Sequence, residues 1–215
     1  MKEIGYNIKS SFLMDENGKC YAITKELDKE QGKSALVIMF SSAVNDAKIT
    51  DNTSHLLWNN MVYLGYSKVT IWNLFPDYKN RNEEQQKANL GVLKKLLKSN
   101  YDSIVIAWGS SKEYASVVIQ EKQAVYKLLE PVKEKLFQIE DEKGFYIDKA
   151  FHPLFAGNYF GFRWKLTSHE IIDLEKEKEG AENENSDKGN DSSVTEIGLH
   201  QFQDKLKNGG NIKNS

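Results

Sequence analysis

Three short, mostly apolar runs constrain the fold of this chain more than any other feature of its sequence. They cover Ala35–Phe40, Lys68–Trp72 and Ser103–Trp108, and a weaker fourth run covers Leu136–Ile139. A short apolar run without regular polar alternation is typical of a β-strand that is buried on both faces. Such a strand needs a covering layer on each side. The runs therefore predict a central sheet inside an α/β domain.

Helical patterns fill the intervals between these runs. Apolar residues recur at helical spacing in Leu57–Leu64, in Leu93–Leu97 and in Ala115–Leu129. Asn82 is a suitable N-cap for the second helix, and Pro131 marks the end of the third. Strands that alternate with helices favour parallel pairing. We therefore predict a three-layer α/β/α fold with a mostly parallel central sheet.

The N-terminal part has a different pattern. Asn17-Gly18 separates two possible strands, Asn7–Met14 and Lys19–Leu27. Asn-Gly is a strong hairpin signal because both residues tolerate a positive φ angle. We expect residues 1–33 to form an N-terminal β-hairpin that packs on the sheet and adds an antiparallel edge to it. The α/β core domain is expected to cover residues 34–167.

The last part of the chain, residues 168–215, is predicted to be an acidic, disordered tail. Between Glu175 and Ser193 the only apolar residue is Ala181, too little apolar surface to offset the entropy of ordering. Val194–Leu206 regains enough apolar residues for a weak amphipathic helix. Two interpretations stay open for that helix: a transient helix without a partner, or a docking segment for a protein partner.

The composition narrows the class of protein. Hydrophobic residues make up 40% of the chain and the net charge is −2, so bulk charge does not argue for or against a nucleic-acid partner. No apolar run approaches the length of a membrane span, and the N-terminal residues lack the apolar core of a secretory signal. With one cysteine, Cys20, and scattered histidines, we expect a cytoplasmic protein without a disulfide, metal site or cofactor.

Polar side chains gather in the segments that follow the predicted strands. Parallel sheets bind their ligands beyond the carboxyl ends of the strands, so these segments are the candidate site. A carboxylate can orient water and an imidazole can donate to a developing anion, so we predict Asp46 and His152 as catalytic residues. The predicted ligand-binding residues are Ser41, Ser42, Asn45, Asn73, Trp108 and Gly109.

Each of these side chains also has a purely structural interpretation. Asp46 suits a local turn bond, and Asn73 suits an Asx-turn that ends its strand. His152 stands in a turn before proline, and Trp108 suits the core. Asp51, in the first of these loops, suits the N-cap of the helix that follows.

Five segments in a fixed order carry a family resemblance over about residues 34–157. They resemble the bacterial domain-of-unknown-function family 1643, whose pattern is an apolar strand ending in Leu-Asn-Pro-Ser-Thr-Ala-Asp-Ala, then Asp-Asp-Pro-Thr, Asn-Leu-Phe, Ala-Trp-Gly and His-Pro-Leu. In this chain Ser41-Ser42 stands where the family has Asn-Pro. The segments are Leu36–Ala47, Asp51–Thr53, Asn73–Phe75, Ala107–Gly109 and His152–Leu154.

The same segments are more distantly similar to the uracil-DNA glycosylase superfamily. That likeness implies that Asp46 orients water, Asn73 reads a base edge and His152 stabilises the departing base. It implies a nucleotide or nucleic-acid base as the ligand and an N-glycosidase-like reaction. The alternative is a non-enzymatic interaction protein with a degenerate site, such as an accessory protein of a bacterial mobile element. Ser41-Ser42 in place of Asn-Pro favours this alternative.

Overall fold

The computed structural model describes residue 5 and residues 7–28, 31–41, 51–109, 115–144 and 150–174. The chain divides into two units, Met1–Ile172 and Asp173–Ser215, and the description below concerns the first. Ser42, Asn45 and Asp46 lie outside the described residues, as does nearly all of the predicted tail. The disorder of that tail stays a prediction, as do the predicted domain boundaries.

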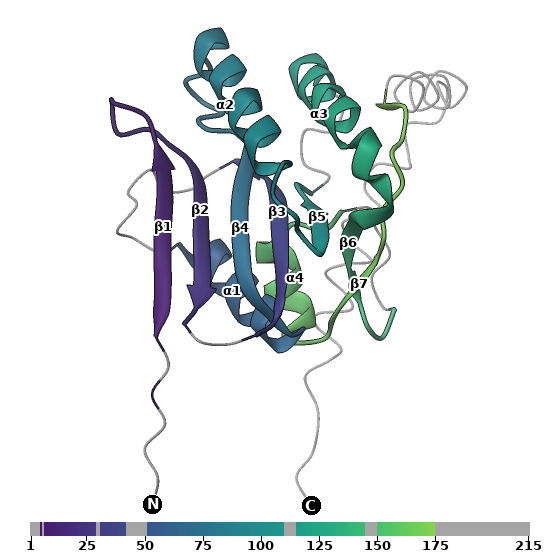
Figure 1. Cartoon of the computed structure of the whole chain (residues 1–215). Helices are drawn as coiled ribbons and strands as arrows, with labels where there is room; N and C mark the ends of the chain where they lie inside the picture. Colours follow the sequence, from purple (N-terminus) through teal and green to yellow (C-terminus); the bar gives the residue numbers. More distant parts are fainter. Residues whose placement is uncertain are drawn as a thin grey trace, which may run out of the picture. The chain divides into compact units, whose positions relative to one another are not determined.

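The described strands form one sheet of seven, in the order β1-β2-β4-β3-β5-β6-β7 (Figure 1). The three apolar runs lie side by side as β4, β3 and β5, and all three are parallel, as predicted. The weaker run forms β6, parallel to β5. The strands are β1 (Ile8–Met14), β2 (Cys20–Leu27), β3 (Lys33–Ser41), β4 (Tyr66–Phe75), β5 (Ser103–Ala107), β6 (Leu136–Asp141) and β7 (Trp164–Ser168).

The prediction of a mostly parallel sheet is wrong, because the sheet is mixed. The hairpin β1–β2 forms as predicted, and it adds the predicted antiparallel edge to the sheet, because β2 pairs antiparallel with β4 over Ala22–Glu26. At the other side β7, which the sequence analysis does not predict, pairs antiparallel with β6. β1 is an edge strand, exposed along its length, with an irregular register between Leu13 and Met14. Antiparallel strands therefore flank a parallel centre.

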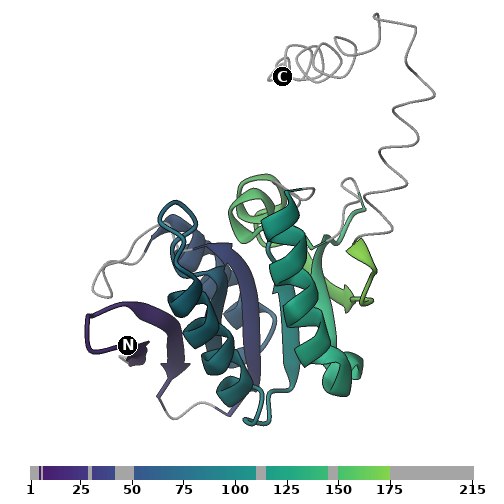
Figure 2. The ribbon, with the colours of Figure 1, turned by 90° about the horizontal axis from the view of Figure 1, so that it is seen from above.

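Helices cover both faces of the sheet. Figures 1 and 2 show α2 and α3 on one face and α1 and α4 on the other, which gives three layers. A short 3-10 helix joins α3 to β6. The helices are α1 (Asn52–Tyr63), α2 (Glu83–Leu96), α3 (Ser116–Leu129), α4 (Pro153–Phe160) and the 3-10 helix η1 (Glu130–Lys135).

Side-chain caps explain where three of the helices begin. The Asp51 carboxylate accepts a hydrogen bond from the Ser54 backbone N–H at 2.9 Å, so the structural interpretation of Asp51 is confirmed. The Asn82 side chain accepts from two backbone N–H groups of the first turn of α2, as predicted. α4 begins with Pro153 after His152 as N-cap. Each cap satisfies N–H groups that have no partner inside the helix.

The core lies on both sides of the central strands. On the α1 and α4 side it joins Val37 and Val105 of the sheet to Leu57 and Phe160 of these helices, and all four are fully buried. The residue that follows β7 also packs on the folded unit. His169 is buried, with Nε2 at 2.8 Å from the Tyr126 hydroxyl and Nδ1 at 2.8 Å from the Gln138 side-chain oxygen.

Candidate functional site

The carboxyl ends of β3, β4 and β5 lie next to one another at one edge of the sheet. The chain leaves β3 for β4 on one side, and the next strand, β5, lies on the other side of β3. Open α/β sheets bind ligands at such a change of direction. Asn73, Met39 and Ala107 form one row across these strands, so Asn73 and Ala107 are about 10 Å apart along it.

His152 sits at the N-terminus of α4 and caps it through one ring nitrogen. Its Nδ1 accepts a hydrogen bond from the Leu154 backbone N–H at 3.3 Å. A ring nitrogen that accepts carries no proton, so the proton of the neutral imidazole is on Nε2. Burial lowers the pKa of His152, and the charge of Asp51 opposes this shift only in part. Near neutral pH, His152 is therefore a neutral imidazole with an Nε2–H donor.

The lowered pKa of His152 makes stability depend on pH. The unfolded chain takes up a proton at His152 near its ordinary pKa of 6.5, while the folded chain resists it. Stability therefore falls as the pH decreases from about 6.5 towards the lower pKa of the folded state. We expect His152→Asn, which keeps a capping side chain, to reduce this loss. The free energy of unfolding in urea, compared at about pH 7.5 and about pH 5.5, measures it; an equal loss in both proteins would contradict the assignment.

Gly109, which lies just after β5, contacts the segment Ala150–His152. Its φ angle is +72°, a left-handed conformation that favours glycine, and its N–H donates to the Ala150 carbonyl at 2.8 Å. A Cβ atom added at Gly109 would lie 3.1 Å from the His152 Cβ. Asp51 acts electrostatically on His152 and also on Lys25 of β2. The structure thus brings Gly109, His152 and Asp51 together.

Asn73 lies near the end of β4 on the same face of the sheet as α1. Val69 and Ile71, which alternate with it, belong to the core that contains Leu57 of α1. The Asn73 Oδ1 atom is buried and has no hydrogen-bond partner among the described residues. An Asx-turn would need that atom as its acceptor, so the described part of the chain contains no Asx-turn at Asn73.

Trp108 is not part of this group. The side chain is 3% exposed, and its ring packs edge-on against Tyr126 of α3 with the centroids 5.2 Å apart. The Lys122 Nζ lies 5.2 Å from the centroid of the same ring. α3 covers the face of the sheet opposite to α4 (Figure 2). The structure places the Trp108 ring in the packing beneath α3, in agreement with its structural interpretation.

Comparison with known proteins gives one match. The family model "Protein of unknown function (DUF1643)" matches residues 20–154, more than half of the chain. The chain belongs to this family. No curated protein and no solved structure matches it significantly. The resemblance to family 1643 is thereby confirmed, whereas the likeness to the uracil-DNA glycosylase superfamily has no support from these comparisons.

This DUF1643 protein has further polar and aromatic groups near the site that the sequence analysis does not predict. Lys25 is one, and it shares a face of β2 with Ile23 and Leu27. Burial lowers the pKa of Lys25, and Asp51 opposes that shift. The alternation of β2 places Lys25 where an apolar side chain is expected, and this irregularity could have identified Lys25 from the sequence.

An aromatic cluster lies at the carboxyl ends of β3 and β4 and includes Tyr78 from the segment after β4. The rings of Phe40, Phe75 and Tyr78 stand 5.0–5.3 Å apart between centroids. The Arg81 guanidinium lies 4.8 Å from the centroid of the Tyr78 ring. Phe75 and Arg81 also line a pocket of about 550 Å³ between the N-terminal parts of α2 and α3. These residues place an apolar and cationic surface at the same edge of the sheet as Asn73.

Among the described residues, no group of three or more His, Cys, Asp or Glu side chains is arranged to hold a metal ion. No helix in the described ranges has the length and apolar character needed to cross a membrane.

Proposed function

We propose that this protein binds a nucleotide or nucleic-acid base at the carboxyl ends of β3, β4 and β5. The observation that carries the proposal is the buried Asn73 Oδ1, which has no partner among the described residues. A buried polar atom without a partner costs about 1–3 kcal/mol. A ligand that donates a hydrogen bond to it recovers that cost. The planar carboxamide offers both a donor and an acceptor, which matches the edge of a base.

His152 supplies the second contact in this proposal. Its Nδ1 caps α4, so Nε2–H is the ring donor that faces away from the cap, and the neutral form donates a hydrogen bond without adding a charge. A base carbonyl, or the negative charge that develops on a departing base, is a suitable acceptor. In the glycosidase-like form of the proposal, Asp46 orients a water whose oxygen attacks the sugar carbon, and the N-glycosidic bond breaks. The electron pair of that bond leaves with the base, and the base takes up the proton that the water loses.

A second candidate function is a non-enzymatic interaction protein. The observation that favours it is Ser41-Ser42, which replaces the Asn-Pro of the family pattern at the end of β3. A site that has lost this motif can keep the fold without its chemistry. Under this proposal the protein binds a partner protein and releases no base.

Binding and base release can be measured separately. The test uses a panel of nucleobases, nucleotides and uracil-bearing or damaged oligonucleotides. We expect Asn73→Leu, which keeps the size of the side chain, to weaken base binding about ten-fold or more because the amide contacts are lost. His152→Asn should weaken binding while preserving the helix cap. Asp46→Asn should bind normally and release no base.

The control is another buried asparagine. The Oδ1 atom of Asn60 also has no partner among the described residues, but Asn60 lies in the C-terminal half of α1. Asn60→Leu should therefore retain binding. Binding without release would leave a base-binding protein. No binding by any member of the panel would remove the proposal and leave the interaction protein.

A further inference from the structure

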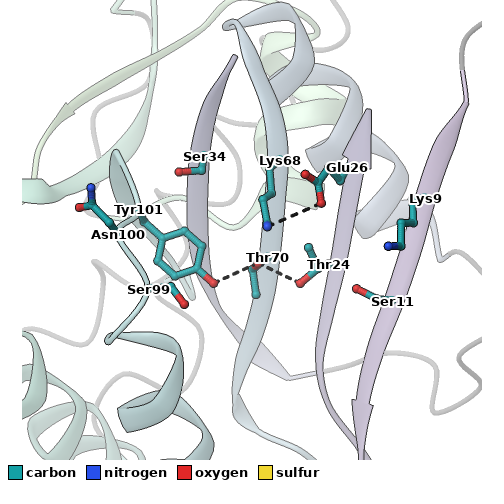
Figure 3. Close-up of a pocket in the computed structure, with 10 residues that line it drawn as sticks. All are labelled: Lys9, Ser11, Thr24, Glu26, Ser34, Lys68, Thr70, Ser99, Asn100 and Tyr101. Atoms are coloured by element: carbon teal, nitrogen blue, oxygen red, sulfur yellow. Dashed lines mark hydrogen bonds and ion pairs between the residues drawn. The ribbon is translucent and has the colours of Figure 1, made fainter. Parts of the chain in front are cut away.

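A second pocket lies at the opposite ends of the parallel strands. It has a volume of about 500 Å³ and is lined by residues of β1, β2 and β4, by Ser34 near the start of β3, and by residues 99–101 before β5 (Figure 3). The pocket lies on the face of the sheet opposite to α1. Thr70, which lines it, alternates along β4 with Val69 and Ile71, and these two residues belong to the core on the α1 side. The pocket is thus separate from the candidate base site in both position and residues.

A chain of three hydroxyl groups leads from the protein interior into this pocket. The Tyr101 hydroxyl donates to Thr70 Oγ1 at 3.2 Å, and Thr70 Oγ1 lies 3.0 Å from Thr24 Oγ1. Thr70 is 1% exposed and Tyr101 is 6% exposed. Either threonine hydroxyl could be the donor in the second contact. In the arrangement in which Thr70 donates to Thr24, the Thr24 proton is left to be donated into the pocket.

Positively charged and hydroxyl groups surround Thr24. Figure 3 shows Lys9 and Ser11 reaching towards it from β1 and Lys68 reaching towards it from β4. Lys68 pairs with Glu26 at 3.6 Å, and both side chains are nearly half exposed, so the pair is weak. Among the residues that line the pocket, two ammonium groups face one carboxylate, which leaves one net positive charge. The Ser34 hydroxyl is not counted as a donor to the pocket, because it donates to Asp102 at 2.9 Å.

We infer that this pocket binds the oxyanion of a phosphate group. Thr24 and Ser11 would donate hydrogen bonds to it, and Lys9 and Lys68 would supply the opposite charge. Hydrogen bonds to a charged acceptor are stronger than those between neutral groups, and the fixed hydroxyl chain orients the Thr24 donor in advance. The phosphate can belong to a free monoester or to the phosphodiester backbone of a nucleic acid, because both present the same oxygens.

Titration calorimetry of the full chain at low ionic strength tests the inference. The three probes are inorganic phosphate, adenosine monophosphate and a short single-stranded oligonucleotide. We expect Thr24→Val, which keeps the branched shape, to weaken binding about five-fold. Lys9→Ala should weaken binding by a similar factor. Glu26→Gln should tighten binding, because it removes the one carboxylate beside the anion. Binding of the monophosphate identifies a free phosphate as the ligand, and binding of the oligonucleotide alone identifies a phosphodiester.

A matched ion pair at the other side of the sheet provides the control. Lys165 and Glu140 pair across β7 and β6 at 3.3 Å, as Lys68 and Glu26 pair across β4 and β2. Lys165→Ala and Glu140→Gln should leave binding unchanged. The inference fails if none of the probes binds, if Thr24→Val binds as well as the parent while folded by circular dichroism, or if Lys165→Ala weakens binding as much as Lys9→Ala.

Discussion

Replacing Ile106 with aspartate should lower the free energy of unfolding by about 4 kcal/mol or more. Ile106 is fully buried in β5, where it pairs with Ile38 of β3 and Gln138 of β6. A carboxylate at this position has helices on both sides and strands on both edges, so water cannot solvate it. Protonation would remove the charge of the aspartate, but the protein would still lack the packing contacts that the isoleucine side chain makes. Urea unfolding followed by circular dichroism measures the effect.

The same substitution at Ile8 is the control. Ile8 lies on the edge strand β1 and is 52% exposed, so an aspartate there stays in water. Ile8→Asp should change the unfolding free energy by less than about 1 kcal/mol. If Ile106→Asp unfolded at the same urea concentration as Ile8→Asp, the central position of β5 would be wrong.

The second large effect is expected at the contact between α1 and α4. A Cβ atom added to Gly157 would lie 2.7 Å from Leu56 Cδ1, closer than real Cβ atoms approach. It would also lie 3.0 Å from Leu56 Cβ, a tight contact that a change of the Leu56 rotamer cannot relieve. Gly157→Val should therefore push the two helices apart and destabilise the protein by about 2–3 kcal/mol. The melting temperature and the urea midpoint report this loss.

Gly91, in the middle of α2, separates the contact from the general effect of valine in a helix. A Cβ atom added there meets no atom within 4 Å. Gly91→Val exchanges the flexibility of glycine for a stiff β-branched side chain, and the two effects nearly cancel, to within about 0.5 kcal/mol. Equal stability of the two valine variants would show that α4 does not pack closely on α1.

Short sequence motifs predicted the parts of the fold that are determined by residues close together in the sequence. Asn17-Gly18 specifies the turn of the β1–β2 hairpin, Asn82 specifies the start of α2, and Pro131 marks the end of α3. The parallel centre was predictable as well, because a strand buried on both faces has an apolar sequence without alternation. These features need no knowledge of the rest of the chain.

The missed elements depend on tertiary contacts. α4 is eight residues long, contains Gly157 and has no clear polar face, so its sequence shows no helical period; its helix is stabilised by packing on α1. β7 is five residues long and precedes the acidic tail. The antiparallel edge made by the hairpin was expected, and the sheet was nevertheless predicted as mostly parallel because β7, which pairs antiparallel with β6, was missed.

The candidate site was predictable in position but not in detail. The rule for strand ends brought Asn73, Gly109 and His152 to the same edge of the sheet. No sequence pattern shows that His152 caps α4 through Nδ1, that Trp108 lies beneath α3, or that the Asn73 Oδ1 atom is buried. These properties follow from the packing of the helices against the strand ends.

The antiparallel hairpin also decides which strand forms the free edge of the sheet. Without β2, the free edge of the sheet would be β4, a strand of ten mostly buried residues and a good template for pairing with another molecule. With the hairpin in place, the edge is the shorter β1, whose register is interrupted between Leu13 and Met14 and which carries Lys9. Strand irregularities and charge at an edge both discourage intermolecular pairing. The hairpin thus moves the free edge from a long, regular strand to a shorter strand with an interrupted register.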